Sequence, residues 1–202
     1  GLLRAPLPAS PVTLLERLAA SAQDGGLPLD TVQASVVSIA IAGYLSTTFL
    51  IGTGLQHLLA NPQAARTLLH GNAAAQSAVI EELLRLDAPA QIVDRVAAQD
   101  VQLGGATIRS GDALMLVLGA ANRDPRAFDD PDALRPGRPV EPGHLSFGAG
   151  IHHCIGAPLA RVVAPIALRA LLGLRGLRLA GQVQWQADPY LRGPTSLPVA
   201  WG

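Results

Sequence analysis

Lysine is absent from the 202-residue sequence, cysteine occurs once, and aromatic residues make up 3%. The single cysteine, Cys154, excludes an internal disulfide and makes a reducing cytoplasm the expected compartment. The 15 basic residues, all arginine, balance 15 acidic residues, so the net charge is zero. That balance, with so few aromatic rings for bases to stack on, argues against a dedicated binder of nucleic acid or of an anionic membrane. Residues 1–10 lack the long apolar core of a signal peptide, and we expect none.

Charged residues are also missing between Thr31 and Ala65, in a chain that is 49% hydrophobic with a mean hydropathy of +0.31. An uncharged apolar stretch of this length can span a bilayer, so a transmembrane helix is one interpretation. Serine, threonine, glycine and histidine residues dilute the stretch, however, and neither flank carries a basic cluster. We therefore expect a buried core helix and no association with a membrane.

The order of elements predicts an α+β fold that is mostly α. Apolar residues at helical spacing alternate with capping signals, and Asp30 with Gln33 forms a candidate capping box at the start of the long apolar helix. Period-two runs follow and predict strands. The expected helices lie at 12–23, from 30 to about 60, at 62–70, at 75–86 and from after Cys154 to about 172. The expected strands are a hairpin at 101–108, a buried strand at 113–120 and short strands within 177–181 and 196–201. An irregular loop is expected at 122–144.

The stretch "FGAGIHHCIG", Phe147 to Gly156, contains the only cysteine. The spacing argues against a zinc site, because the side chains of three consecutive residues diverge and the chain has no C-x-x-C or H-x-x-x-H pair. A nucleophilic thiol with a histidine base, or a plain buried cysteine, remains possible on composition alone. Neither explains the three glycines, which would bring backbone close to a ligand, nor the helix that starts after the sulfur and would stabilise a thiolate.

This combination resembles the cysteine loop of the cytochromes P-450, the haem-thiolate monooxygenases, which has the form F-G-x-G-x-H-x-C-x-G. A second element of that family is E-x-x-R on a helix, and a third is an arginine in the loop before the cysteine. The matching residues are Phe147, Gly148, Gly150, His152, Cys154 and Gly156 in the loop, Glu82 and Arg85 in "EELLR", and Arg138 in "LRPGR". The resemblance runs from about Pro11 to Trp201 and implies the C-terminal part of that fold, with residues 1–202 as one haem-binding portion and the N-terminal half absent.

The resemblance also implies roles for individual residues. Cys154 would ligate the iron of haem b, Phe147 would shield the sulfur, and the three loop glycines, Gly148, Gly150 and Gly156, would let the backbone approach the porphyrin. His152 and Arg95 would hold the haem propionates. Glu82, Arg85 and Arg138 would form a buried structural network. Ala42 and Gly43 would lie over the oxygen-binding face on the distal helix, which is the long uncharged helix.

One position departs from the family pattern, which reads A-G-x-(Asp/Glu)-Thr on the distal helix. In "AGYLST", Leu45 takes the acid position and Ser46 the alcohol position, with Thr47 next to it. Leu45 cannot relay a proton, whereas Ser46 or Thr47 can. The alternatives are proton delivery through water and the substrate, radical coupling, and oxidation driven directly by peroxide.

The resemblance implies a cytoplasmic enzyme that uses O2 and electrons from a ferredoxin and its reductase. The substrate would be a small apolar, polyketide-derived or peptide-derived molecule. The alternative is a truncated, non-catalytic relative that acts as an auxiliary or interaction protein. The resemblance places substrate-lining positions at Tyr44, Leu45, Ile92, Val93, Tyr190 and Leu191, with Ala90 and Gln91 in the same segment.

Overall fold

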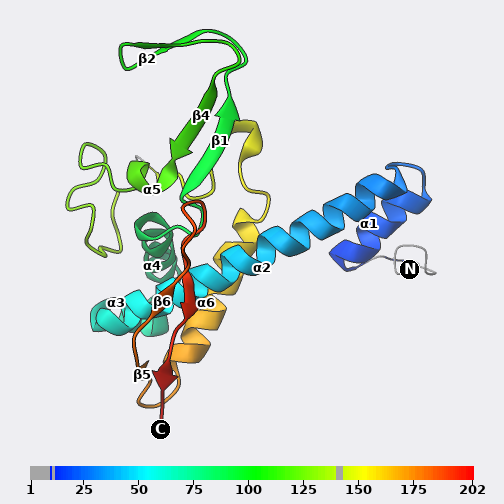
Figure 1. Cartoon of the computed structure of the whole chain (residues 1–202). Coiled ribbons are helices and arrows are strands. Elements are labelled where there is room, and N and C mark those ends of the chain that lie inside the picture. Colours follow the sequence, from blue (N-terminus) through cyan, green and yellow to red (C-terminus); the bar gives the residue numbers. More distant parts are fainter. Residues whose placement is uncertain (1–9, 11, 140–142) are drawn as a thin grey trace. The chain divides into compact units, whose positions relative to one another are not determined.

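The computed structural model describes residues 10, 12–139 and 143–202 (Figure 1). The chain divides into two compact units, with the boundary between Leu45 and Ser46. In the first unit, helix α1 (Leu14–Gln23) begins with a complete capping box. Thr13 Oγ1 accepts the Glu16 N–H, and the Glu16 carboxylate accepts the N–H of Thr13. Helix α2 (Leu29–Ala60) begins one residue before Asp30, so Asp30 lies in the first turn of α2 and the sequence-based start is one residue late.

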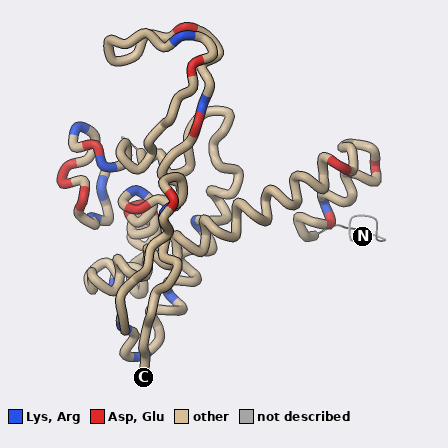
Figure 2. Tube along the Cα trace, in the orientation of Figure 1, with Lys and Arg blue, Asp and Glu red and all other residues tan. Residues whose placement is uncertain are grey.

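Helix α2 crosses the boundary between the two units, and its two parts differ in burial. It is long and apolar enough to span a membrane by length and composition alone. Figure 2 shows that no charged position interrupts it after its first turn. The buried residues after Leu45 are Phe49, Leu50, Thr53, Gly54, Leu55 and Leu58, whereas before Leu45 only Val32 is buried among the described residues of this helix.

The expectation of a buried core helix is therefore wrong for the first part of α2. Val37, Ile41 and Tyr44 are exposed there. Burial requires a second layer of structure against each face. Within the first unit α1 is the one other helix among the described residues.

The second unit has a helical core. Helix α3 (Pro62–His70) is capped by the Asn61 side chain, as the helix-start signal Asn61-Pro62 predicts. Helix α4 (Ala73–Leu86) is capped by the Asn72 side chain and begins two residues before the expected start at 75. Helix α6 (Ala157–Leu172) continues through Pro165. Apolar side chains of α3, α4, α6 and the end of α2 pack together at Leu50, Leu55, Leu58, Ala64, Leu68, Val79, Ile80, Leu83, Leu84, Ala164 and Leu168.

The strands form four small antiparallel pairs. Strand β1 (Ile92–Val96) pairs with β4 (Ala113–Val117), and β2 (Val101–Leu103) pairs with β3 (Ala106–Ile108) as the predicted hairpin. Strand β5 (Arg178–Leu179) pairs with β8 (Val199–Ala200), and β6 (Gln184–Trp185) pairs with β7 (Pro194–Ser196). Mixed helices and small sheets agree with the expected α+β class.

The prediction for 113–120 is wrong in two respects. The strand ends at Val117 and is followed by a short helix, α5 (Leu118–Ala121). Met115, Leu116 and Val117 are also exposed rather than buried, because β4 belongs to a two-stranded sheet without a covering layer among the described residues. Residues 122–139 contain neither helix nor strand, which agrees with the predicted irregular loop; its predicted positions 140–142 lie outside the described residues.

Candidate functional site

The loop before α6 folds back so that the backbone of Cys154 lies against that of Phe147. Gly148 and Gly150 have φ values of 68° and 69°, a left-handed conformation that glycine adopts without steric cost. The Cys154 N–H donates to the Phe147 carbonyl at 2.8 Å, and the Gly148 N–H donates to the Leu145 carbonyl at 2.8 Å. The two glycines therefore allow the tight reversal that presents the cysteine.

The Cys154 thiol is exposed, and helix α6 begins three residues later. A Cβ added at Gly156 would lie 3.7 Å from the sulfur, so the backbone passes close to it. Ile151 and Ile155 are 97% and 88% exposed, which places two apolar side chains in solvent beside the thiol. An exposed cysteine sulfur near a helix N-terminus and beside uncovered apolar groups fits a haem, whose iron accepts cysteine as a ligand and whose ring is large and apolar.

The two residues predicted to hold haem propionates lie on different elements. His152 is exposed at the end of the short 3₁₀ helix Gly150–His152. Arg95 lies on β1, and its guanidinium donates to the Asp94 carbonyl at 2.7 Å. No hydrogen bond joins His152 to Arg95 among the described residues.

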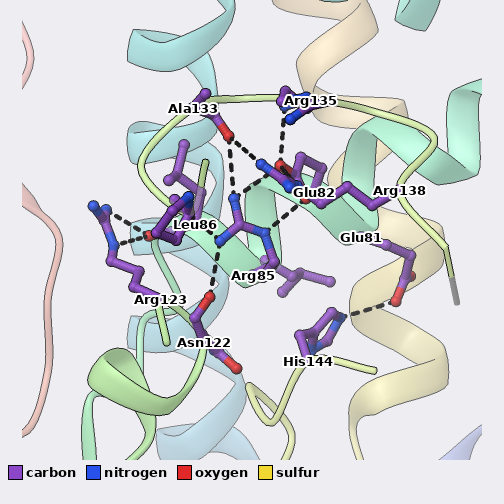
Figure 3. Close-up of polar contacts among 12 residues, drawn as sticks. Glu81, Glu82, Arg85, Leu86, Asn122, Arg123, Ala133, Arg135, Arg138 and His144 are labelled. Atoms are coloured by element: carbon purple, nitrogen blue, oxygen red, sulfur yellow. Dashed lines mark hydrogen bonds and ion pairs between the residues drawn. The ribbon is translucent and has the colours of Figure 1, made fainter. Parts of the chain in front are cut away.

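Glu82, Arg85 and Arg138 come together in a buried cluster (Figure 3). Arg85 binds both carboxylate oxygens of Glu82 at 2.8 Å, and Arg138 Nε binds Glu82 Oε1 at 2.8 Å. Burial raises the pKa of Glu82, but the hydrogen bonds from Arg85 and Arg138 outweigh it and hold the pKa below its usual value. The carboxylate is therefore ionised, and the three side chains link α4 to the loop that precedes the cysteine.

Arg85 also fixes the course of that loop through backbone carbonyls. Its guanidinium donates to the carbonyls of Asn122 and Pro131 at 2.8 Å and of Ala133 at 3.1 Å. The Arg135 N–H adds a bond to Glu82 Oε1 at 2.9 Å. An irregular segment is thus held by one arginine and one glutamate, which explains how it keeps its course without a helix or strand.

Two further groups were not identified from sequence. Asn122 is fully buried, and its amide joins Ser146 Oγ at 2.9 Å and the Leu145 N–H at 2.7 Å. Glu81, next to Glu82, binds a different set of partners near the cysteine loop. Both depend on contacts with residues far away in the chain, and neither belongs to a motif with a recognisable spacing.

The two predicted substrate-lining segments of the second unit lie side by side. Ala90 and Leu191 form an antiparallel bridge, and the Gln91 N–H donates to the Tyr190 carbonyl at 2.8 Å. A hydrogen bond to the Asp94 carboxylate, together with its charge, raises the pKa of the Tyr190 phenol. Ile92 and Val93, at the start of β1, are half-buried.

The predicted distal residues all lie in α2. Leu45, Ser46 and Thr47 are half-buried, whereas Ala42, Gly43 and Tyr44 are exposed. Ala42 to Leu45 belong to the first unit, and Ser46 and Thr47 belong to the second. The helix runs continuously through the stretch, so the backbone itself distinguishes neither Ser46 nor Thr47.

Comparison with known proteins gives one consistent family. The family profile described as Cytochrome P450 matches residues 76–174. The chain is 39% identical over 180 residues to 6-deoxyerythronolide B hydroxylase of Saccharopolyspora erythraea, an alignment that covers 87% of this chain and 44% of the relative. It is 42% identical over 172 residues to the mycinamicin IV hydroxylase/epoxidase of Micromonospora griseorubida, covering 82% of this chain and 43% of the relative. The chain therefore spans less than half the length of these two relatives.

Solved structures give the same result at the level of fold. The crystal structure of CalO2 superposes with a TM-score of 0.85 at 32% identity, covering 95% of this chain and 49% of that one. The tirandamycin C-bound P450 monooxygenase TamI superposes with a TM-score of 0.84 at 34% identity, covering 96% of this chain and 50% of that one.

Proposed function

This chain belongs to the cytochrome P450 family and spans part of its fold, and we propose that it carries the haem-thiolate site of a monooxygenase. The observation that carries the proposal is the exposed thiol of Cys154 on a glycine-formed reversal in front of α6. The family implies a haem-iron cofactor, and haem b is the proposed form.

Each residue of the site has a proposed task. Cys154 would bind the iron as a thiolate, and Phe147 would shield the sulfur of the haem-loaded chain from water. His152 and Arg95 bind the two propionates through charge-assisted hydrogen bonds. A bound haem would supply the activation of O2, with Cys154 as its thiolate ligand. Glu82, Arg85 and Arg138 have a structural role, because their contacts fix the loop before the cysteine.

Proton delivery is proposed to use a hydroxyl rather than a carboxylate. Ser46 or Thr47 holds the proton at its side-chain oxygen and passes it on, with water in place of the acid that Leu45 does not supply. The missing acid also favours a second chemistry, oxidation driven by peroxide or radical coupling. A comparison of turnover with O2 plus reductant and turnover with peroxide distinguishes the O2-dependent reaction from the peroxide-driven one.

The proposed substrate is a small apolar molecule derived from a polyketide or a peptide. Two relatives carry the names 6-deoxyerythronolide B hydroxylase and mycinamicin IV hydroxylase/epoxidase, which support this class. Within the second unit, the proposed lining comes from Ile92 and Val93 on β1 and from Tyr190 and Leu191 near the C-terminus. The proposed partners are a ferredoxin and its reductase, and the proposed compartment is the cytoplasm, as suits the bacterial relatives.

A reduced carbon monoxide difference spectrum tests the proposal. We expect the haem-loaded chain to show the Soret band of a thiolate-ligated haem, and Cys154→Ser to lose that band. Arg169→Lys, which keeps the charge at an exposed position of α6, is the control and should keep it. Failure of the chain to take up haem would overturn the proposal. Haem uptake with the band but without turnover would favour the non-catalytic relative.

A further inference from the structure

Glu81 holds two elements that flank the cysteine loop. Its carboxylate binds Arg161 of α6 through two parallel bonds, from Nε to Oε1 at 2.7 Å and from Nη2 to Oε2 at 2.8 Å. The same carboxylate lies 3.0 Å from His144 Nε2, in the segment that leads into Phe147 (Figure 3). Burial raises the pKa of Glu81, but the bonds from His144 and Arg161 lower it to about 2, so the carboxylate is ionised.

The second ring nitrogen of His144 fixes the direction of this bond. The Ser146 N–H donates to His144 Nδ1 at 3.2 Å, which leaves Nε2 as the donor to Glu81 Oε2. The His144 side chain is 9% exposed, which restricts the ring to this arrangement.

Phe147 lies in contact with both partners of Glu81. The Arg161 guanidinium carbon lies 4.6 Å from the centre of the Phe147 ring, and the His144 ring centre lies 5.9 Å from it. The backbone carbonyl of Phe147 accepts the Cys154 N–H. A continuous set of contacts thus runs from Glu81 through Arg161 and His144 to Phe147 and on to the cysteine.

We propose that Glu81 is a positioning residue for the cysteine loop, acting through Arg161 and His144 on Phe147 and thereby on the Cys154 sulfur. This inference rests on the proposed haem-thiolate function and adds a residue outside the motifs that suggested it. The neighbouring Glu82 instead binds Arg135 and Arg138 of the loop 122–139. The two adjacent carboxylates therefore have separate roles: Glu82 stabilises the loop 122–139, and Glu81 orients the loop that carries the Cys154 sulfur.

Amide hydrogen exchange on the full 202-residue chain tests the positioning role without requiring haem. Removal of the carboxylate in Glu81→Ala frees Arg161 and His144, so Phe147 loses two of its contacts. We expect the amides of Cys154 and Gly148, whose hydrogen bonds close the loop, to exchange about threefold to tenfold faster. Amides of α3, which Glu81 does not contact, should keep their rates. Glu81→Gln retains an acceptor for both partners and should recover part of the protection.

Asp124→Ala is the matched control. Asp124 also binds an arginine, Arg126, through both carboxylate oxygens, and its pKa is likewise lowered to about 2, first by the side-chain hydrogen bond from Arg126. That pair is on the surface and has no contact with the cysteine loop among the described residues. The control should leave the Cys154 and Gly148 amides unchanged. Equal acceleration of all core amides in Glu81→Ala would reveal general destabilisation and overturn the inference.

A second readout uses the haem-loaded chain. We expect the thiolate band to disappear about threefold to tenfold faster in Glu81→Ala than in the unchanged chain. If the unchanged chain takes up no haem, the proposed function fails, while the exchange experiment still tests Glu81. If the unchanged chain shows the thiolate band and Glu81→Ala matches Asp124→Ala in both readouts, the positioning role is wrong and the proposed function stands.

Discussion

Asp87 and Arg192 are 105 residues apart in the chain, yet Arg192 Nε lies 2.6 Å from Asp87 Oδ1 at the end of α4. His57 of α2 binds the other oxygen of Asp87 at 3.1 Å. Asp87 is only 4% exposed, and it accepts from two elements that are distant in sequence. Burial raises the pKa of Asp87, but the bond from His57 and the charge of Arg192 outweigh it and lower the pKa. One carboxylate thus ties the C-terminal segment to the helical core.

Asp87→Asn removes that charge at constant size. The amide cannot bind Arg192 as an ion and leaves a guanidinium beside a buried neutral group. We expect a loss of about 2–4 kcal/mol in the free energy of unfolding. Urea unfolding monitored by circular dichroism measures it. Asp132→Asn, which breaks the exposed Arg123 pair, should cost less than about 1 kcal/mol and serves as the control. Equal losses in the two variants would contradict the anchoring role of Asp87.

Arg85→Lys should also destabilise the chain, although it preserves the charge. Lysine has no planar fork, so it cannot bind both oxygens of Glu82 while donating to three backbone carbonyls. Arg85 is 3% exposed, and water cannot replace the lost bonds easily. We expect a loss of about 3 kcal/mol or more, with faster proteolysis in the loop 122–139. Arg66→Lys on the surface of α3 is the control. A stable variant with an intact loop would show that the network is dispensable.

Much of the second unit could be predicted from sequence because its signals are local. Asn61 before Pro62 defines the start of α3 within two residues. Gly104 and Gly105, both with positive φ, form the turn of the hairpin that separates β2 from β3. The spacing of Glu82 and Arg85 places both on one face of α4, so their pairing also follows from the local sequence.

The remainder depends on contacts that the sequence does not encode locally. Strand β1 was not predicted, because "IVDRV" acquires its strand conformation from β4, about twenty residues later. The burial of α2 and β4 was overestimated, since an apolar composition does not reveal whether another layer covers it. Glu81 resembled an ordinary surface residue, because its partners His144 and Arg161 are 63 and 80 residues away.

Acid should destabilise the chain partly through Glu81. The pKa of Glu81 in the folded chain is about 2, below the usual 4.5, because the bonds from His144 and Arg161 outweigh the effect of burial. A carboxylate with a lowered folded pKa stabilises the fold fully above its unfolded pKa, and this contribution is lost as the pH falls toward the folded pKa. We expect the melting temperature to fall between about pH 5 and about pH 2, and less steeply in Glu81→Gln.

Asp124→Asn provides the comparison for this pH dependence. The pKa of Asp124 is also lowered to about 2, but its partner Arg126 is only two residues away. That pair can form in the unfolded chain as well, so its linkage to folding is small. The partners of Glu81 are lost on unfolding. Asp124→Asn should therefore keep the acid slope of the unchanged chain, and an equal change of slope in both variants would refute the assignment to Glu81.

Leu45→Asp tests the proposed route for protons on α2. An acid at this position supplies the group that the family pattern places before the alcohol, next to the hydroxyls of Ser46 and Thr47. We expect turnover with O2 plus reductant to rise about tenfold relative to turnover with peroxide, since general acid–base groups typically contribute such factors or more. Ile39→Asp introduces the same charge on another face of the helix and should not change the ratio. An unchanged ratio in Leu45→Asp would show that the proposed argument for proton delivery on α2 is wrong.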